Sequence, residues 1–168
     1  KWATRIGSIR QMPDLMHLAL GKSISGRPGG VYLDFPGNIV SETIEDGSIP
    51  LRTQLPDVSN PYPDPGSIER IAEMLAAAQR PLVLIGKGAA WSDAAEPLRR
   101  LVDRGIPFVA SPMGRGTIPD DHEMSMAAAR NTAIRGADAV LMVGAKFNWM
   151  FQQGMNLAPG VQIGRAHV

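Results

Sequence analysis

Two short apolar runs each end at a glycine with a lysine close behind, and these lysines are the residues best suited to chemistry. The runs and the residues that follow them are Pro81–Ile85 with Gly86, Lys87 and Gly88, and Val140–Val143 with Gly144, Ala145 and Lys146. Glycine lets backbone approach a ligand closely and lysine supplies positive charge, so the pattern predicts a phosphate or nucleotide site. The alternative is that the glycines only turn the chain and the lysines face solvent, and spacing alone leaves both open.

Alternating strands and helices must position these residues. The predicted order is a helix from Pro65 behind the N-cap Asp64, a strand 82–85, a helix ending before Gly105, a strand 107–110, a weaker helix 127–135 and a strand 139–143. This β-α-β-α-β order predicts an α/β fold with an open parallel sheet. Loops 86–90, 111–116 and 144–149 then leave the same sheet edge, and we expect Lys87, Arg115 and Lys146 to converge there.

The N-terminal residues predict a smaller structural unit. Met12, Leu15, Met16 and Ala19 recur at helical spacing behind Pro13, and we expect that helix to stop at Gly21. A turn then leads into a β-prone run, 31–35, so the piece is predicted as helix, turn and strand. Residues 41–64 are rich in proline and lack periodicity, which predicts a linker between two domains.

Composition excludes several classes of protein. The 168 residues carry 17 Lys and Arg against 16 Asp and Glu, without a basic cluster, so no nucleic-acid partner is expected. Without cysteine there are no disulfides, thiolate metal sites or cysteine nucleophiles, which is compatible with a cytoplasmic protein. The apolar runs are far too short to span a bilayer, so no membrane partner is expected either.

Other chemistry finds little support. The dinucleotide fingerprint G-x-G-x-x-G is incomplete because Trp91 stands at its third glycine, and no P-loop motif occurs. His17 is interpreted as a packed histidine and His122 as part of a polar turn, while Asp103 is expected at the surface. We therefore predict neither a catalytic residue nor a metal ligand in this chain.

The last residues break the pattern where we expect a strand to start, at Val161 and Gln162. The hexapeptide Ile163–Val168 resembles a translated sequencing adapter. We therefore expect residues 164–168 to be a non-native tail and leave them out of the predicted fold.

Taken together, four segments resemble thiamine-diphosphate enzymes, in particular oxalyl-CoA decarboxylase and 2-hydroxyacyl-CoA lyase. The segments are Gly26–Pro36, Ile85–Ala90, Pro112–His122 and Gly144–Trp149. The resemblance implies that residues 1–40 end a pyrimidine-binding domain, 41–64 form a linker and 65–163 form most of a Rossmann-like central domain.

The resemblance also implies a function for the full-length protein. Such an enzyme cleaves a carbon–carbon bond beside a CoA thioester, with thiamine diphosphate as electron sink and Mg²⁺ as its partner. The sites for both are expected outside this chain, so the chain alone is expected to be inactive. Family members are generally homodimers or homotetramers.

The resemblance assigns an ADP-like nucleotide to the central domain. It implies nucleotide contacts for five residues, Arg27, Gly86, Lys87, Gly88 and Lys146. Lys146 replaces the usual arginine, and Gly164 stands where the family has an aspartate for the ribose. Arg130 is a candidate for binding CoA. Two alternatives remain: an acetolactate-synthase-like enzyme with FAD in this domain, and a non-catalytic nucleotide-binding module.

Overall fold

The computed structural model describes residues 1–58 and 62–166, and the chain divides into two units, Lys1–Pro61 and Tyr62–Val168. The boundary falls within the proline-rich segment 41–64 that was predicted as a linker. None of the described helices is long and apolar enough to cross a membrane.

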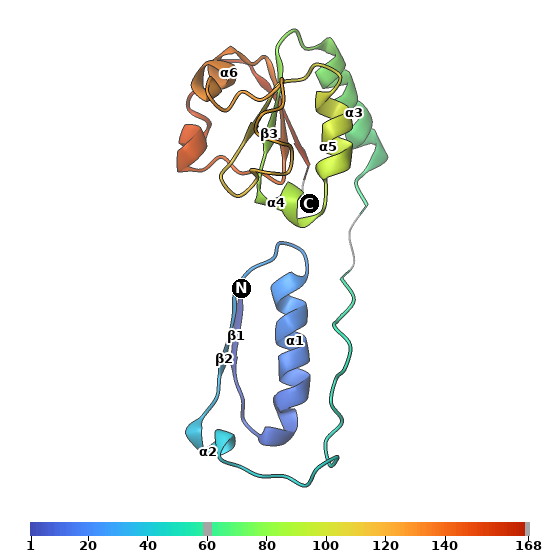
Figure 1. The fold of residues 1–168 in the computed structure, drawn as a ribbon, viewed down its shortest axis with the longest axis vertical. Coiled ribbons are helices and arrows are strands. Elements are labelled where there is room, and N and C mark those ends of the chain that lie inside the picture. The colour runs from blue at the N-terminus through green and yellow to red at the C-terminus, as the bar shows by residue number, and fades with distance from the viewer. Residues whose placement is uncertain (59–61, 167–168) are drawn as a thin grey trace. The chain divides into compact units, whose positions relative to one another are not determined.

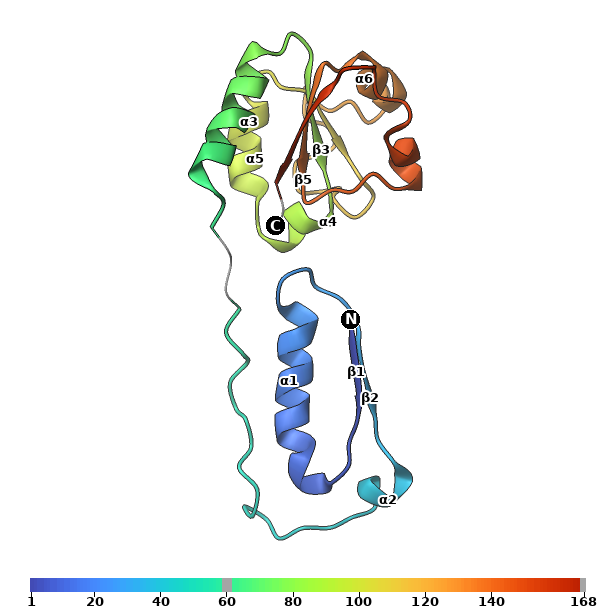
Figure 2. The same cartoon turned by 180° about the vertical axis from the view of Figure 1, so that it is seen from behind.

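The first unit is a β-α-β piece with short helices at its turns (Figures 1 and 2). Its elements are β1 (Trp2–Arg5), η1 (Ile9–Gln11), α1 (Met12–Ile24), β2 (Val31–Asp34) and α2 (Gly37–Val40). Strands β1 and β2 pair in parallel, with Trp2 opposite Val31 and Arg5 opposite Asp34. The helix and the second strand confirm the prediction, but β1 was missed because four residues carry too short a pattern.

Gly21 does not end α1, which is a second correction to the sequence reading. The helix continues to Ile24, and Ser25 caps it by donating its backbone N–H to the Gly21 carbonyl. A Cβ at Gly21 would lie 3.1 Å from the Pro56 side chain. Glycine at this position therefore serves close packing against the following segment instead of a helix stop. The Met16 side chain, one of the apolar residues at helical spacing, is 40% exposed.

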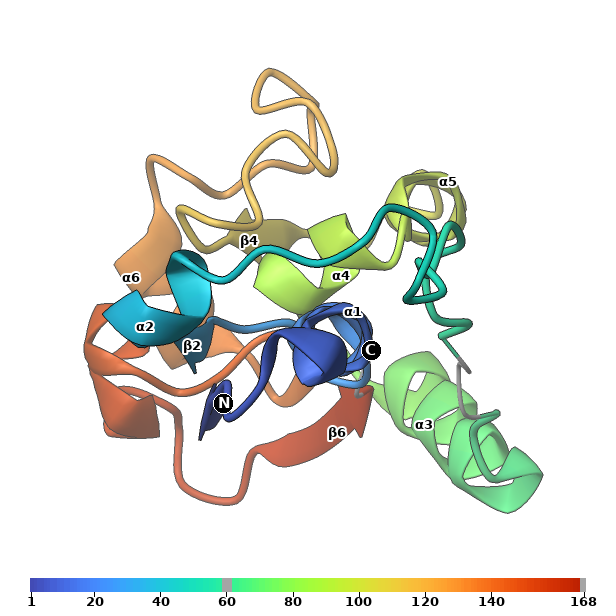
Figure 3. The same cartoon turned by 90° about the horizontal axis from the view of Figure 1, so that it is seen from below.

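The second unit is a four-stranded parallel sheet with helices on both faces (Figures 1 and 3). Its elements are α3 (Pro65–Ala77), β3 (Pro81–Ile85), α4 (Lys87–Trp91), α5 (Ala95–Val102), β4 (Phe108–Ala110), α6 (Arg130–Gly136), β5 (Ala139–Val143), η2 (Trp149–Gly154) and β6 (Gln162–Ala166). The strand order is β4-β3-β5-β6, with every neighbouring pair parallel. The predicted α/β fold with an open parallel sheet is confirmed.

Both faces of this sheet are buried, which explains why β3 and β5 are uninterrupted apolar runs. Leu82, Leu84, Val140 and Met142 point to one face, where Ile134 of α6 and Phe151 of η2 cover them. Val83, Ile85, Leu141 and Val143 point to the other, where Leu98 and Val102 of α5 pack. Ile71 and Leu75 of α3 extend that second face. The two central strands thereby hold the loops at their ends in fixed places.

Strand β6 runs past the predicted native end at residue 163. Gly164, Arg165 and Ala166 pair with Leu141, Met142 and Val143 of β5. A Cβ at Gly164 would lie 3.1 Å from the side chains of Ile71 and Met74 of α3. These three residues complete the edge of the sheet, whereas His167 and Val168 lie outside the described residues.

Candidate nucleotide site and adjoining cavity

The loops after β3 and β5 flank the point where the chain reverses its direction across the sheet. From β3 the chain crosses over α4 and α5 to β4 on one side, and then over α6 to β5 on the other. Parallel α/β sheets bind ligands at the carboxyl ends of the strands beside such a switch point. Lys87 follows β3 and Lys146 follows β5, so the topology brings both lysine-bearing loops to this point.

The glycines of these loops let two backbones pack directly against each other. A Cβ at Gly86 would lie 2.2 Å from the Gly144 carbonyl oxygen, and one at Gly144 would lie 2.2 Å from the Ala89 nitrogen. Gly144 also has a φ of 57°, which favours glycine. A Cβ at Gly114, in the loop after β4, would lie 2.5 Å from the Ile85 carbonyl oxygen. No side chain fits at these contacts.

Backbone hydrogen bonds between the loops use the amides that the sequence suggested for a phosphate. The Gly86 N–H donates to the Val143 carbonyl at 2.9 Å, and the Gly88 N–H donates to the Gly144 carbonyl at 3.0 Å. These two amides hold the β3 and β5 loops together and are not free donors. Nucleotide contacts of Gly86 and Gly88 stay a prediction, and the structural reason for glycine here is the close approach of the loops.

The two lysines keep an uncompensated charge. The Lys87 ammonium lies 5.3 Å from the centroid of the Trp91 ring, on the same short helix α4. Lys146 is exposed. Within residues 1–58 and 62–166, no carboxylate lies within 4.0 Å of either ammonium. Both cations can therefore serve an anion at the switch point.

Arg115, the third cation expected at this edge, already has a partner. Its Nε donates to Asp120 at 2.9 Å, and a second guanidinium nitrogen donates to the same carboxylate oxygen. These hydrogen bonds, together with the charge of Asp120, raise the pKa of the Arg115 guanidinium above its usual value. The expected convergence of three free cations is therefore reduced to the two lysines.

A cavity of about 240 Å³ lies beside this pair, at the outer edge of β4. Its lining includes Ala110, Arg115, Asp120, Ser125, Arg130 and Met150. Arg130 begins α6, is half-buried and makes no hydrogen bond or ion pair with any other described side chain. It therefore brings an unused positive charge to the cavity wall.

The outer edge of β4 is only partly paired. The Phe108 N–H donates to the Met124 carbonyl, and the Phe108 carbonyl accepts from the Met126 N–H. On the other side, the backbone N–H of Ser111 donates to the Ile85 carbonyl of β3. Because successive residues of a strand direct their backbone groups to opposite sides, the N–H and carbonyl of Ala110 face the outer edge. Because Ala110 lines the cavity, a ligand there meets an open strand edge as well as Arg130.

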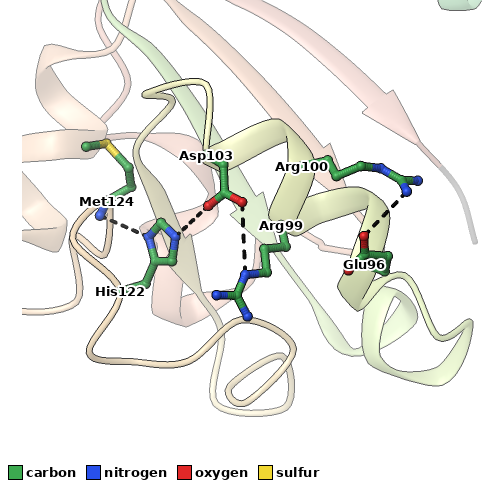
Figure 4. Close-up of polar contacts among 6 residues, drawn as sticks. All are labelled: Glu96, Arg99, Arg100, Asp103, His122 and Met124. Atoms are coloured by element: carbon green, nitrogen blue, oxygen red, sulfur yellow. Dashed lines mark hydrogen bonds and ion pairs between the residues drawn. The ribbon is translucent and has the colours of Figure 1, made fainter.

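His122 ties the long loop after β4 to helix α5 (Figure 4). One of its ring nitrogens, Nε2, lies 3.0 Å from Asp103, and the other, Nδ1, accepts the Met124 N–H at 3.1 Å. The acceptor role of Nδ1 places the proton on Nε2, which then donates to Asp103. The His122 ring also packs edge-on against Phe108. Sequence reasoning recognised a polar turn here but missed Asp103 as its partner, because the two residues are 19 positions apart.

No metal site accompanies these groups. Among the described residues, His, Cys, Asp and Glu side chains nowhere gather in threes to hold an ion. The described residues therefore show no cluster of this kind for the Mg²⁺ that the resemblance implies. Arg27 is exposed on the turn between α1 and β2 of the first unit, and its predicted role stays a prediction.

Comparisons with known proteins agree with the geometry of this unit. The family model described as "Thiamine pyrophosphate enzyme, central domain" matches residues 68–165. The chain is 39% identical to a 2-hydroxyacyl-CoA lyase of Oryza sativa subsp. japonica over 164 residues and 40% identical to the oxalyl-CoA decarboxylase of Escherichia coli K12 over 159 residues. Each match covers 92% of this chain and 28% of the relative. The human 2-hydroxyacyl-CoA lyase 1 is 35% identical, with 92% of this chain and 27% of the relative covered.

The chain thus spans little more than a quarter of the length of these relatives. The family model covers more than half of the chain, from within α3 to within β6, and includes all four strands of the second unit. This chain belongs to the thiamine pyrophosphate enzyme family, and its second unit contains that family's central domain.

Proposed function

We propose that this chain is part of a thiamine-diphosphate-dependent lyase or decarboxylase that cleaves a carbon–carbon bond beside a CoA thioester. The observation that carries the proposal is the similarity to 2-hydroxyacyl-CoA lyases and oxalyl-CoA decarboxylases across 92% of the chain. Thiamine diphosphate would supply the electron sink for the cleavage. Its site and that of Mg²⁺ are proposed to lie in other parts of the full-length protein.

Within this chain, the proposed task of the switch-point loops is to bind an ADP-like nucleotide. Lys87 and Lys146 bring two uncompensated charges to the carboxyl ends of β3 and β5, where such folds bind phosphates. Charge-assisted hydrogen bonds contribute about 1.5–3 kcal/mol each. Since the Gly86 and Gly88 amides are already paired, we assign phosphate binding to the lysine side chains.

The cavity beside β4 is the proposed contact point for the CoA moiety. CoA carries phosphates and amide groups, and the cavity offers the Arg130 guanidinium next to the open backbone edge at Ala110. Arg115 is less suited to a phosphate because Asp120 already occupies its guanidinium. We therefore propose Arg130 as the CoA-binding cation of this chain.

Calorimetric titration of the 168-residue chain tests both binding sites. CoA affinity should fall about tenfold in Arg130→Ala and stay unchanged in Arg135→Ala, an exposed arginine at the other end of the same helix. ADP affinity should fall by a similar factor in Lys87→Ala. Equal loss of CoA affinity in both arginine variants would contradict the assignment of Arg130. At the nucleotide site, tighter binding of FAD than of ADP would favour the acetolactate-synthase-like alternative.

The catalytic proposal is tested on the full-length protein. With thiamine diphosphate and Mg²⁺ present, it should cleave oxalyl-CoA, measured as released carbon dioxide, or a 2-hydroxyacyl-CoA, measured as released aldehyde. Omission of thiamine diphosphate should abolish either activity. Turnover of neither thioester by a protein loaded with the cofactor would contradict the proposed reaction.

A further inference from the structure

Trp91 is an exposed aromatic residue at the position where a dinucleotide fingerprint would carry its third glycine. In that fingerprint the glycine allows close packing of helix against strand. Here the indole is 59% exposed and lies on the same face of α4 as Lys87, four residues earlier. Neither the packing of the sheet nor the proposed contacts of the nucleotide account for a large apolar side chain at this exposed place.

The contact between Trp91 and Lys87 gives the ring a role. The Lys87 ammonium lies 5.3 Å from the ring centroid, within the distance at which the negative face of an indole attracts a cation. We propose that Trp91 is a positioning residue, which holds the Lys87 ammonium at the switch point for an incoming phosphate. This inference rests on the nucleotide site proposed above.

The aromatic partner differs from a carboxylate in its effect on charge. Asp120 holds Arg115 in place but also neutralises it. An indole has no net charge, so Lys87 keeps its full attraction for an anion while its side chain is restrained. An unrestrained lysine loses rotamer freedom when it binds a phosphate, and this loss costs conformational entropy. Because contact with the ring already restrains the Lys87 side chain, part of that cost is met before the phosphate binds. Trp91 should therefore tighten the binding of a phosphate without touching it.

Two substitutions separate the ring from the size of the side chain. In calorimetry with ADP, Trp91→Leu should weaken binding about two- to fivefold, and Trp91→Phe, which keeps an aromatic face, should restore most of the affinity. Lys22→Ala, an exposed lysine on α1, serves as the control for Lys87→Ala and should leave ADP affinity unchanged. Because Trp91 is largely exposed, these variants should fold, which circular dichroism can verify.

A double variant tests whether the ring acts through the lysine. In the Lys87→Ala background, Trp91→Leu should have no further effect on ADP affinity. The side-chain proton resonances of Lys87 should also lie upfield of those of Lys22 because of the indole ring current, and Trp91→Leu should remove this shift.

The outcomes distinguish this inference from the proposed site. Wild-type protein that binds no ADP would overturn both the nucleotide site and the positioning role. Wild-type binding with unchanged affinity in Trp91→Leu would overturn the positioning role alone. A loss that persists in the Lys87→Ala background would mean that the ring contacts the ligand directly, which also overturns it.

Discussion

The loops after β3 and β4 each present a cation near the carboxyl ends of neighbouring strands, yet the structure treats the two cations differently. Lys87 faces the Trp91 ring and keeps its charge, whereas Arg115 is hydrogen-bonded to Asp120. The β3 loop is held by backbone bonds and glycine contacts with the β5 loop. The chain after β4 also makes backbone contacts, at Gly114 and Phe108, but it is held in addition by side chains, through the Arg115–Asp120 and His122–Asp103 pairs.

This difference indicates separate tasks for the two loops. Backbone packing at the switch point uses no charged side chain, so the lysines remain available to a ligand. In the chain after β4, the Arg115–Asp120 ion pair and the His122–Asp103 hydrogen bond hold the loop itself, and Arg130 is the other cation at the adjoining cavity. The presence of a cation in a loop is therefore a weaker indicator of a ligand than its lack of a carboxylate partner.

The largest expected effect comes from disturbing the glycine contact. Gly144→Ala would place a Cβ 2.2 Å from the Ala89 nitrogen at a φ of 57°, and should destabilise the second unit by about 3 kcal/mol or more. Gly136→Ala, at the end of α6 with no atom within 4 Å, is the control and should change stability by less than about 1 kcal/mol. Urea unfolding followed by circular dichroism compares the two, and equal stability would contradict the backbone-packing role.

Removal of the His122 side chain, which links the chain after β4 to the end of helix α5, should have the next largest effect on stability. His122→Ala would leave the Met124 N–H without its acceptor and remove the contact with Phe108. The expected loss is about 2 kcal/mol in the free energy of unfolding. Hydrogen exchange should locate the change in residues 111–129, while exchange in the β3 and β5 loops stays as in wild type. Faster exchange in all these loops alike would show that they are not held independently.

A smaller effect should distinguish Lys87 from Arg115 in the binding of ADP. Lys87→Ala should weaken ADP binding about tenfold, whereas Arg115→Ala should leave it within about twofold of wild type. Both variants lose one positive charge, so a general electrostatic effect would appear equally in each. Similar losses in calorimetry at the same ionic strength would remove the proposed distinction between the two loops.

The smallest effect concerns Asp138, which directly precedes β5 and so lies at the end of the strands opposite the candidate nucleotide site. Asp138 accepts the backbone N–H groups of Gln79 at 3.0 Å and Arg80 at 2.9 Å. Partial removal from water raises the pKa of Asp138, but hydrogen bonds from the amides of Arg80 and Gln79, together with the charge of Arg80, lower it by more. The net pKa therefore lies below its usual value.

This direction determines how stability depends on pH. A carboxylate whose pKa is lower in the folded state stabilises the fold above its unfolded pKa of about 3.9, and the contribution is lost as the pH falls through the folded value. Asp138→Asn should therefore lower the urea midpoint at pH 7, and the difference from wild type should shrink in acid. Glu73→Gln, exposed on α3, is the control. A difference that stayed constant down to about pH 2 would contradict a role for the ionised carboxylate.

Much of the second unit could be predicted because its signals are local. Asp64 caps α3 through its own side chain, which accepts the Ser67 N–H. The apolar runs of β3 and β5 indicate strands buried on both faces, and the alternation of strands and helices indicates a parallel sheet. The lysines after the two strands could be placed at one edge from this order alone.

The partners of the candidate residues could not be predicted in the same way. Asp103 and His122 meet only when α5 and the chain after β4 pack together, and β1 forms only by pairing with β2. Asp120 lies five residues after Arg115, so its pairing was open to sequence reasoning, but sequence spacing does not indicate which carboxylate takes the charge.

The amino-acid sequence by itself determined the elements, their order and the glycine-lysine loops, because propensity, capping and hydrophobic pattern act between near neighbours. The tertiary structure decided what those glycines and cations do. It paired the Gly86 and Gly88 amides with the β5 loop, gave Arg115 a carboxylate and Lys87 an aromatic ring, and left Arg130 beside an open strand edge. These outcomes depend on which distant groups come into contact, and only the folded chain brings them together.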